Sequence, residues 1–168
     1  MLGAYKEQTG ESSVDFTDKA IDKLGYIPKI IQTDNGAENT IPNKKNAKPD
    51  TIHEFDKFCQ SLDIYHQLIR PYTPRHQGKV ERSHRTDMDC FYSCHKKPEK
   101  QFTSFEHFAS ELALWNERYN KMPNSSLRNR DGKKVWLSPY QKKAELLEDL
   151  QANGNYENIW FLNDKLLT

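Results

Sequence analysis

Hydrophobic and polar residues along this chain follow the two spacings that distinguish helices from strands. Apolar side chains recur every three to four positions across Ser12–Leu24, and Gly25 follows, so we predict a helix that ends at this glycine. Short apolar runs at Ile30–Ile31 and Ile64–Ile69 predict two strands. A further short strand is expected at Leu2–Tyr5.

The segment between the two main predicted strands carries the signals of a helix. Thr51 and Glu54 are spaced as a capping box, in which each side chain bonds the other residue's backbone. The apolar face that follows consists of Ile52, Phe55, Cys59 and Leu62. Residues 29–69 therefore form a predicted strand–helix–strand unit. A connection of this length favours parallel strands joined by a right-handed crossover.

Helices dominate the predictions for the rest of the chain. One runs over about residues 79–95, and Thr103 with Glu106 forms a second capping box. Alternating spacings of three and four then predict a buried stripe made of Phe105, Phe108, Leu112, Trp115 and Tyr119. Ser138-Pro139 begins a last helix. The aromatic and apolar tail after Gly154 is expected to dock either on the body of the protein or on a partner.

Composition narrows the classes of protein to consider. The chain has 168 residues, which suits one domain, and only 35% of them are hydrophobic, so its core is thin. Three cysteines, an odd number, argue for a reducing, cytoplasmic setting rather than a disulfide framework. Cys90, Cys94 and His95 lack the spacing of a zinc knuckle. No apolar run approaches the roughly 18 residues of a membrane span, so no membrane partner is expected.

Charge is concentrated in one window, although the net charge of the chain is only +1. Between His66 and Arg85 there are five Arg or Lys residues and one acid, Glu81. Cations gathered in this way are typical of phosphate binding, and a single carboxylate among them suits metal-assisted chemistry on a nucleic acid. A solvated surface helix explains the same charges without any chemical role.

Asp34 and Glu81 are the two acids that the predicted topology brings together. Asp34 follows the strand at Ile30–Ile31, and Glu81 lies near the start of the helix after the neighbouring strand. A right-handed crossover places both at one edge of the sheet, where two carboxylates can hold Mg²⁺ or Mn²⁺ together with water and phosphate oxygens. The alternative is that Asp34, Asn35 and Gly36 form a polar turn with no chemical role.

Two sequence blocks make a family recognisable. Ile31–Glu38 contains Thr-Asp-Asn-Gly, and Leu68–His84 contains Arg-Pro-Tyr-Thr-Pro followed by Gly-Lys-Val-Glu-Arg. Together they resemble the catalytic core of DDE transposases, and look most like bacterial insertion-sequence transposases related to retroviral integrases. Gln77 departs mildly from the family's usual Asn. The resemblance implies that Asp34 and Glu81 are catalytic and bind the metal. It also implies an α/β, ribonuclease H-like fold, here incomplete: a short parallel strand pair with a crossover helix, followed by C-terminal helices.

The family has a third catalytic acid, on the first strand of its sheet, and this chain departs from that pattern. Asp15 and Asp18 lie on the first predicted helix, so neither fits a strand position. We therefore expect a core truncated at its N-terminus, with residues 1–122 as the partial catalytic core and residues 123–168 as a basic loop, helix and tail. Loss of one acid weakens metal binding, so the isolated chain is expected to be inactive.

The activity that the resemblance implies is Mg²⁺-dependent phosphodiester cleavage and strand transfer in DNA transposition. Candidates for contacts to DNA phosphates are Arg70, Arg75, Lys79, Arg82 and Arg85, for each of which solvated surface charge is an equal alternative. For His66 and His84, a position away from DNA is the simpler interpretation. The alternative function is a non-catalytic DNA-binding or subunit-interaction fragment that modulates a full-length transposase. The expected partners are therefore DNA and other transposase subunits.

Overall fold

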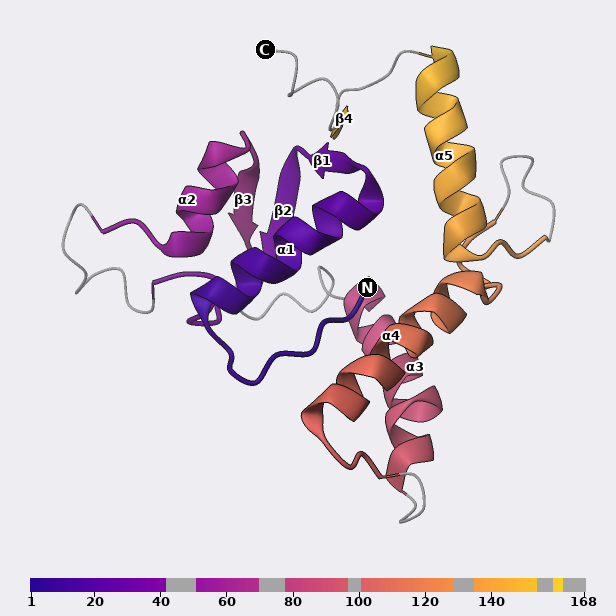
Figure 1. The fold of residues 1–168 in the computed structure, drawn as a ribbon. Helices are drawn as coiled ribbons and strands as arrows, with labels where there is room; N and C mark the ends of the chain where they lie inside the picture. The colour runs from indigo at the N-terminus through magenta and orange to yellow at the C-terminus, as the bar shows by residue number, and fades with distance from the viewer. Residues whose placement is uncertain (42–50, 70–77, 97–100, 129–134, 154–158, 162–168) are drawn as a thin grey trace. The chain divides into compact units, whose positions relative to one another are not determined.

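The computed structural model describes the chain except for residues 42–50, 70–77, 97–100, 129–134, 154–158 and 162–168. The chain divides into two compact units. We call Tyr5–Cys94 with Asn158–Thr168 the strand unit, and Met1–Ala4 with His95–Glu157 the helical unit (Figure 1). These units are defined by contacts within the chain, and they do not test the predicted domain boundary at residue 122, which stays a prediction.

Helix α1 (Gly10–Leu24) opens the strand unit and confirms the first predicted helix, with a start two residues earlier. Thr9 is its N-cap, and the Thr9 hydroxyl oxygen accepts a hydrogen bond from the backbone N–H of Ser12 at 3.2 Å. Gly25 ends the helix at φ 77°, a left-handed conformation that glycine adopts without steric cost. The glycine therefore sets the point at which the chain turns into the first strand.

Strands β2 (Ile30–Thr33) and β3 (Tyr65–Leu68) are parallel, as predicted. Their register places Ile31 opposite His66 and Thr33 opposite Leu68. Because parallel strands run in the same direction, the residues after Thr33 and after Leu68 leave the sheet at the same edge. This edge is where the sequence predicts the chemistry.

Strand β1 (Tyr26–Pro28) forms a separate antiparallel pair with β4 (Ile159–Phe161). The register sets Ile27 opposite Trp160. Ile159–Phe161 of the C-terminal tail therefore pair with a strand of the same unit, in line with the first of the two expectations. The expected strand at Leu2–Tyr5 is wrong, because these residues have neither helix nor strand structure.

Helix α2 (Glu54–Ser61) connects β2 to β3, but the predicted capping box at its start is wrong. The N-cap is His53, whose Nδ1 accepts a hydrogen bond from the Phe55 N–H at 3.1 Å. The other ring nitrogen of His53 bonds the carbonyl of Ala37 at 3.0 Å, so Nε2 carries the hydrogen and Nδ1 is free to accept. A histidine thus replaces Thr51 as the capping side chain.

The core of the strand unit is a small apolar cluster. Its buried members are Ile21, Ile27, Phe55, Cys59 and Ile64, and Val14, Ile31, Phe58 and Leu62 pack around them. Helix α1 contacts both α2 and β1, and α2 contacts β3 (Figure 1). Burial raises the pKa of the Cys59 thiol to about 11, so this cysteine is an unreactive core residue.

Helix α3 (Gly78–Cys90) follows β3, and the short 3-10 helix η3 (Tyr92–Lys96) follows α3. The predicted helix over residues 79–95 is therefore confirmed in its first part, and its last turn is a tighter 3-10 segment. Phe91, at the junction, is buried, which gives the chain a fixed point where the two helix types meet.

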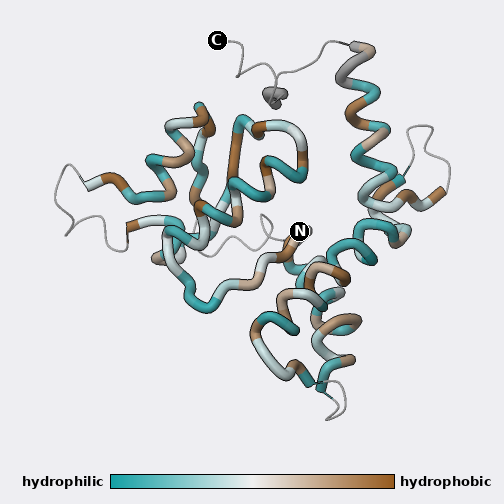
Figure 2. Tube along the Cα trace, viewed as in Figure 1, coloured by the Kyte–Doolittle hydropathy of each residue, from teal (hydrophilic) through white to brown (hydrophobic). Residues whose placement is uncertain are grey.

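The helical unit consists mainly of α4 (Phe105–Lys121) and α5 (Pro139–Asn153), which pack together. Along α4, hydrophobic and hydrophilic segments alternate (Figure 2), and Leu112 and Trp115 of the predicted stripe are buried. The N-cap of α4 is Ser104, one residue after the predicted Thr103, since its hydroxyl accepts the N–H of His107 at 3.1 Å.

The start of α5 is confirmed. The Ser138 hydroxyl accepts from the N–H of Gln141 at 3.2 Å, and the Gln141 side chain accepts from the Ser138 N–H at 2.8 Å. These reciprocal bonds satisfy two backbone donors that a helix start otherwise leaves open. No helix among the described residues is long and apolar enough to cross a membrane.

Candidate functional site

Asp34 lies directly after β2, and its side chain is exposed. One carboxylate oxygen, Oδ1, accepts two hydrogen bonds, each of 3.0 Å, from the backbone N–H of Gly36 and the side-chain amide of Asn39. The described residues give Oδ2 no hydrogen bond. The carboxylate of this exposed residue is therefore fixed through one oxygen, Oδ1.

The loop that carries Asp34 is tied to the ends of both strands. The Asn35 side-chain amide donates to the carbonyl of Ile69 at 2.9 Å, and the Ile69 N–H donates to the carbonyl of Thr33 at 2.9 Å. Within the loop, the N–H of Asn39 donates to the carbonyl of Gly36 at 3.0 Å. The predicted turn at Asn35 and Gly36 is thus present, and it forms part of a hydrogen-bonded strand terminus.

A partly buried polar pair, Asp56 and His66, lies next to the end of β2. His66 Nδ1 is 2.6 Å from Oδ1 of Asp56, and His66 Nε2 is 2.7 Å from the hydroxyl of Thr33. The His66 side chain is only 5% exposed, and its ring meets Phe55 edge-on with centroids 4.9 Å apart. His66 therefore supports the strand end from inside, and its burial leaves it no surface for DNA contact.

The hydroxyl hydrogen of Thr33 has two acceptors within reach, the ring of His66 and the carbonyl of Asp34 at 3.0 Å. If Thr33 donates to that carbonyl, Nε2 of His66 must donate to Thr33 and the ring is an imidazolium. If the ring is neutral with its hydrogen on Nδ1, Thr33 donates to Nε2. In both arrangements His66 donates to Asp56, so the same three side chains remain joined.

Glu81, the second predicted acid, lies in the first turn of α3, and its side chain is exposed. Arg82 and Arg85 follow it and are also exposed. The guanidinium of Arg85 is 3.8 Å from the carboxylate of Asp89, but their side chains are 85% and 67% exposed, so this pair is a weak restraint. Both arginines therefore remain accessible to an anionic partner.

The other predicted DNA contacts are described less fully. Lys79 lies in the first turn of α3. Arg70 and Arg75 fall outside the described residues. Asp34 and Glu81 both belong to the strand unit. Among the described residues, no three His, Cys, Asp or Glu side chains gather closely enough to hold a metal ion.

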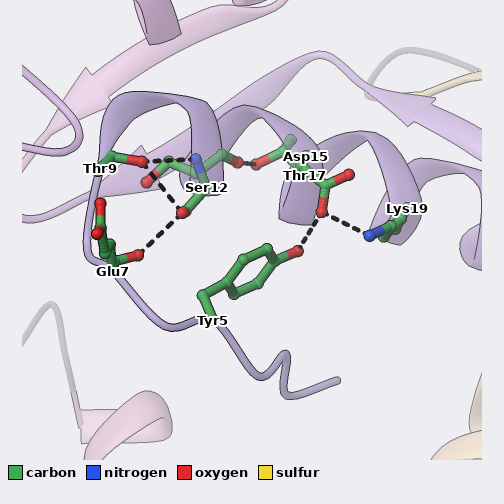
Figure 3. Close-up of polar contacts among 8 residues, drawn as sticks. Tyr5, Glu7, Thr9, Ser12, Asp15, Thr17 and Lys19 are labelled. Carbon is green, nitrogen blue, oxygen red and sulfur yellow. Dashed lines mark hydrogen bonds and ion pairs between the residues drawn. The ribbon is translucent and has the colours of Figure 1, made fainter. Parts of the chain in front are cut away.

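Asp15, which was set aside as a third acid, is committed elsewhere (Figure 3). One of its oxygens accepts from the Tyr5 hydroxyl and from the Lys19 ammonium, each at 2.6 Å. The Lys19 bond, followed by the Tyr5 bond, lowers the pKa of Asp15. Burial and then the bond to Asp15 raise the pKa of Tyr5 to about 12. This contact pins the N-terminal segment to α1.

The chemistry of the available donors fits a hard divalent cation. The two predicted acids, Asp34 and Glu81, are both exposed. Magnesium prefers oxygen ligands and usually binds through one or two carboxylates, with water and phosphate oxygens completing its shell. Asp34, at the end of β2, and Glu81, on α3, are oxygen donors of this kind.

The fold at this site is that of an integrase core. The family model described as "Integrase core domain" matches residues 62–131. The structure of the BIV integrase catalytic core domain has a TM-score of 0.57 to this one at 22% identity, with 86% of this chain and 77% of that chain covered. The HTLV-2 integrase catalytic core domain in complex with magnesium has a TM-score of 0.50 at 24% identity, over 82% of this chain and 72% of that chain.

A curated relative shares the same region. The Gag-Pro-Pol polyprotein of squirrel monkey retrovirus is 41% identical over 81 residues, which are 47% of this chain and 4% of the polyprotein. The chain thus spans a small part of the curated relative it matches. Together, these similarities show that the chain has the α/β, ribonuclease H-like fold of integrase catalytic cores, and that residues 62–131 are similar to the integrase core domain.

The network around Asp34 was not predicted from the sequence. Asn39 and the Asp56–His66–Thr33 contacts join residues from separate elements. Of these residues, the sequence draws attention only to His66, in connection with DNA contact. Asn39 has one local signal, since it lies five positions after an acid in a turn. The pairing of Asp56 with His66 needs the fold, because ten residues and a change of element separate them.

Proposed function

We propose that this chain provides catalytic residues of a DDE-type transposase or integrase, a polynucleotidyl transferase that acts on DNA. The observation that supports this most directly is the position of Asp34. It lies at the carboxyl end of β2 in a parallel pair, with one oxygen held by the loop and the other without a hydrogen bond from the described residues. Glu81, in the helix that follows the neighbouring strand, is the second ligand.

The proposed reaction is in-line displacement at phosphorus. A water oxygen attacks a phosphodiester, a new P–O bond forms, and the bond to the 3′ oxygen breaks, which leaves a 3′-hydroxyl. The oxygen of that hydroxyl then attacks a phosphodiester of the target DNA: a new P–O bond joins the two DNAs, and the bond to the target's 3′ oxygen breaks, which leaves a 3′-hydroxyl on the target. A bound Mg²⁺ or Mn²⁺ supplies charge neutralisation for the attacking and leaving oxygens. Asp34 and Glu81 hold the ion, and the cations of α3 hold the phosphates of the DNA.

Two ligands are fewer than the three acids that the family resemblance implies. We therefore propose that the third acid comes from outside these 168 residues, and that this chain is inactive by itself. In the same proposal, the partners are DNA and other transposase subunits, which complete the assembly. The proposed setting is cytoplasmic, in keeping with the buried, unpaired thiol of Cys59.

The test is Glu81→Gln in a complete assembly that contains this chain. The substitution keeps the size of the side chain and removes its charge, so we expect strand transfer with Mg²⁺ to fall by at least about a thousandfold. Asp89→Asn on the same helix is the matched control, since Asp89 is exposed and pairs only weakly with Arg85. Normal strand transfer by Glu81→Gln would rule out the assignment.

A second candidate function is DNA binding without catalysis, which the exposed arginines of α3 favour. If they contact phosphates, the affinity of the 168-residue chain for duplex DNA falls steeply with salt. Arg82→Gln and Arg85→Gln should each reduce the slope of log K against log salt by about 1. DNA binding with this salt dependence, together with strand transfer that survives Glu81→Gln, would favour this second function.

A further inference from the structure

We infer that Asn39 is a positioning residue that fixes the carboxylate of Asp34, and that Ser13 of α1 holds Asn39 in place. The inference rests on the proposed function, because it assigns the residues that prepare Asp34 for its ligand. Its starting point is a chain of two side-chain hydrogen bonds that runs from α1 to the strand end.

The contacts lead from a helix to one carboxylate oxygen. The Ser13 hydroxyl donates to Oδ1 of Asn39 at 3.2 Å, and Nδ2 of Asn39 donates to Oδ1 of Asp34 at 3.0 Å. Ser13 lies within α1, so it is anchored to the packed body of the strand unit. Ser13 and Asn39 are both half-buried, whereas Asp34 is exposed. The less exposed residues therefore constrain the more exposed one.

The orientation of the Asn39 amide follows from the charge of its neighbour. A carboxylate only accepts hydrogen bonds, so the group that faces Asp34 must be the NH₂ of Asn39. The opposite orientation would bring two acceptor oxygens together. The carbonyl oxygen of Asn39 then faces Ser13, whose hydroxyl has a hydrogen to give. Each partner in the chain is satisfied in one arrangement only.

The backbone adds a second restraint on the same atom. The N–H of Gly36 donates to Oδ1 of Asp34, so this oxygen receives two bonds from different directions. Two donors on Oδ1 fix the side-chain rotamer, whereas Oδ2 receives no hydrogen bond from the described residues. A ligand oxygen held in advance loses less conformational entropy when it binds a cation. Without Asn39, the Gly36 bond alone would hold the carboxylate.

The experiment reads the Asp34 rotamer directly, in the metal-free 168-residue chain. Three-bond NMR couplings from the backbone to the carboxyl carbon of Asp34 report whether its χ1 is fixed or averaged. The test variant is Asn39→Leu, which keeps the volume and removes the donor. The matched control is Gln8→Leu, because the Gln8 amide bonds Glu38 of the same loop at 2.6 Å and leaves Asp34 untouched.

We expect one rotamer in the wild type and in Gln8→Leu, and an averaged rotamer in Asn39→Leu. Ser13→Ala should give partial averaging, since it releases Asn39 without removing it. Averaged couplings in the wild type, or unchanged couplings in Asn39→Leu, would overturn the inference. If Asn39→Leu does not fold, Ser13→Ala decides the matter with the same measurement.

A second readout separates this inference from the proposed function. Mn²⁺ added to the chain broadens the amide signals of Gly36 and Ala37 if the ion binds at Asp34. We expect Asn39→Leu to weaken this binding by about tenfold. Absence of Mn²⁺-dependent broadening in the wild type would contradict the proposed metal site while leaving the rotamer result intact. Broadening with equal affinity in Asn39→Leu would overturn the positioning role alone.

Discussion

The two units of this protein hold their partly buried polar side chains in different ways. In the strand unit, Asp56 and His66 form a short hydrogen bond of 2.6 Å. The other ring nitrogen of His66 bonds the hydroxyl of Thr33, the residue before Asp34. In the helical unit, Asn116 exchanges bonds of 2.7 and 2.8 Å with the backbone of Leu2.

The first network leads to an exposed acid, and the second ends at the backbone of a terminal segment. The strand-unit network therefore supports the residue next to a candidate functional side chain, whereas the contact of Asn116 with Leu2 only fixes a backbone segment. Asp34 has its carboxylate at the surface, so the side chains behind it decide where it points. Leu2 carries no polar side chain, and the amide of Asn116 satisfies both of its backbone groups in a half-buried position.

The largest predicted effect breaks the core of the strand unit. Phe55→Ala removes a ring that is 2% exposed, and we expect a loss of about 3–5 kcal/mol of unfolding free energy. Residue-resolved amide hydrogen exchange should show faster exchange in β2 and β3 and a smaller change in α4. The reciprocal variant Leu112→Ala should affect α4 first. If amide exchange became faster to the same extent in both units, the two units would unfold as one cooperative structure, and the difference in stability between them would be absent.

The next largest effect is expected on the stability of the Asp56–His66 pair. His66→Ala leaves Asp56 and Thr33 without their partner, so we expect a loss of about 1.5–3 kcal/mol, measured by urea unfolding. His84→Ala is the control, because His84 is exposed on α3 and should change stability by less than about 0.5 kcal/mol. Equal stability of the two variants would mean that the pair does not support the strand end.

A smaller loss of stability is expected when the contact between Asn116 and Leu2 in the helical unit is removed. Asn116→Ala removes two neutral hydrogen bonds to Leu2, and we expect a loss of about 1–2 kcal/mol. The Leu2 amide should lose its protection from hydrogen exchange, while the amides of β2 and β3 keep theirs. Loss of protection in the strands as well would contradict the separation of the two networks.

The smallest effect concerns Tyr5 and appears only at high pH. The pKa of Tyr5 is raised from its ordinary value of 10.0 to about 12, so the folded state holds this proton more tightly than the unfolded state. The stabilisation is complete below pH 10 and is lost as pH rises toward 12. An ultraviolet absorbance titration of Tyr5→Phe should lack the tyrosine that ionises last in the wild type. Identical titrations would show that the contact with Asp15 is absent in solution.

The sequence was sufficient for the elements whose signals are local. Glycine at position 25 ended α1 because only a residue without Cβ adopts its φ cheaply, and the stripe in α4 followed from helical periodicity. Parallel pairing of β2 and β3 followed from the length of their connection. The two capping boxes failed because several side chains near each helix start can accept an N–H. His53 and Ser104 are the N-caps in the structure, and residue spacing alone does not distinguish them from Thr51 and Thr103.

The sequence by itself therefore determined the strand–helix–strand order and the resemblance to integrase cores, because each depends on residues close together in the chain. Only the tertiary structure decided how Asp34 is held. Ser13, Asn39 and Asp34 come from a helix, a loop and a strand end, and the folded strand unit, in which α1 packs against α2 and β1, brings them together. Hydrogen bonds act over about 3 Å, so no spacing in the sequence can reveal them until the fold has brought their atoms together.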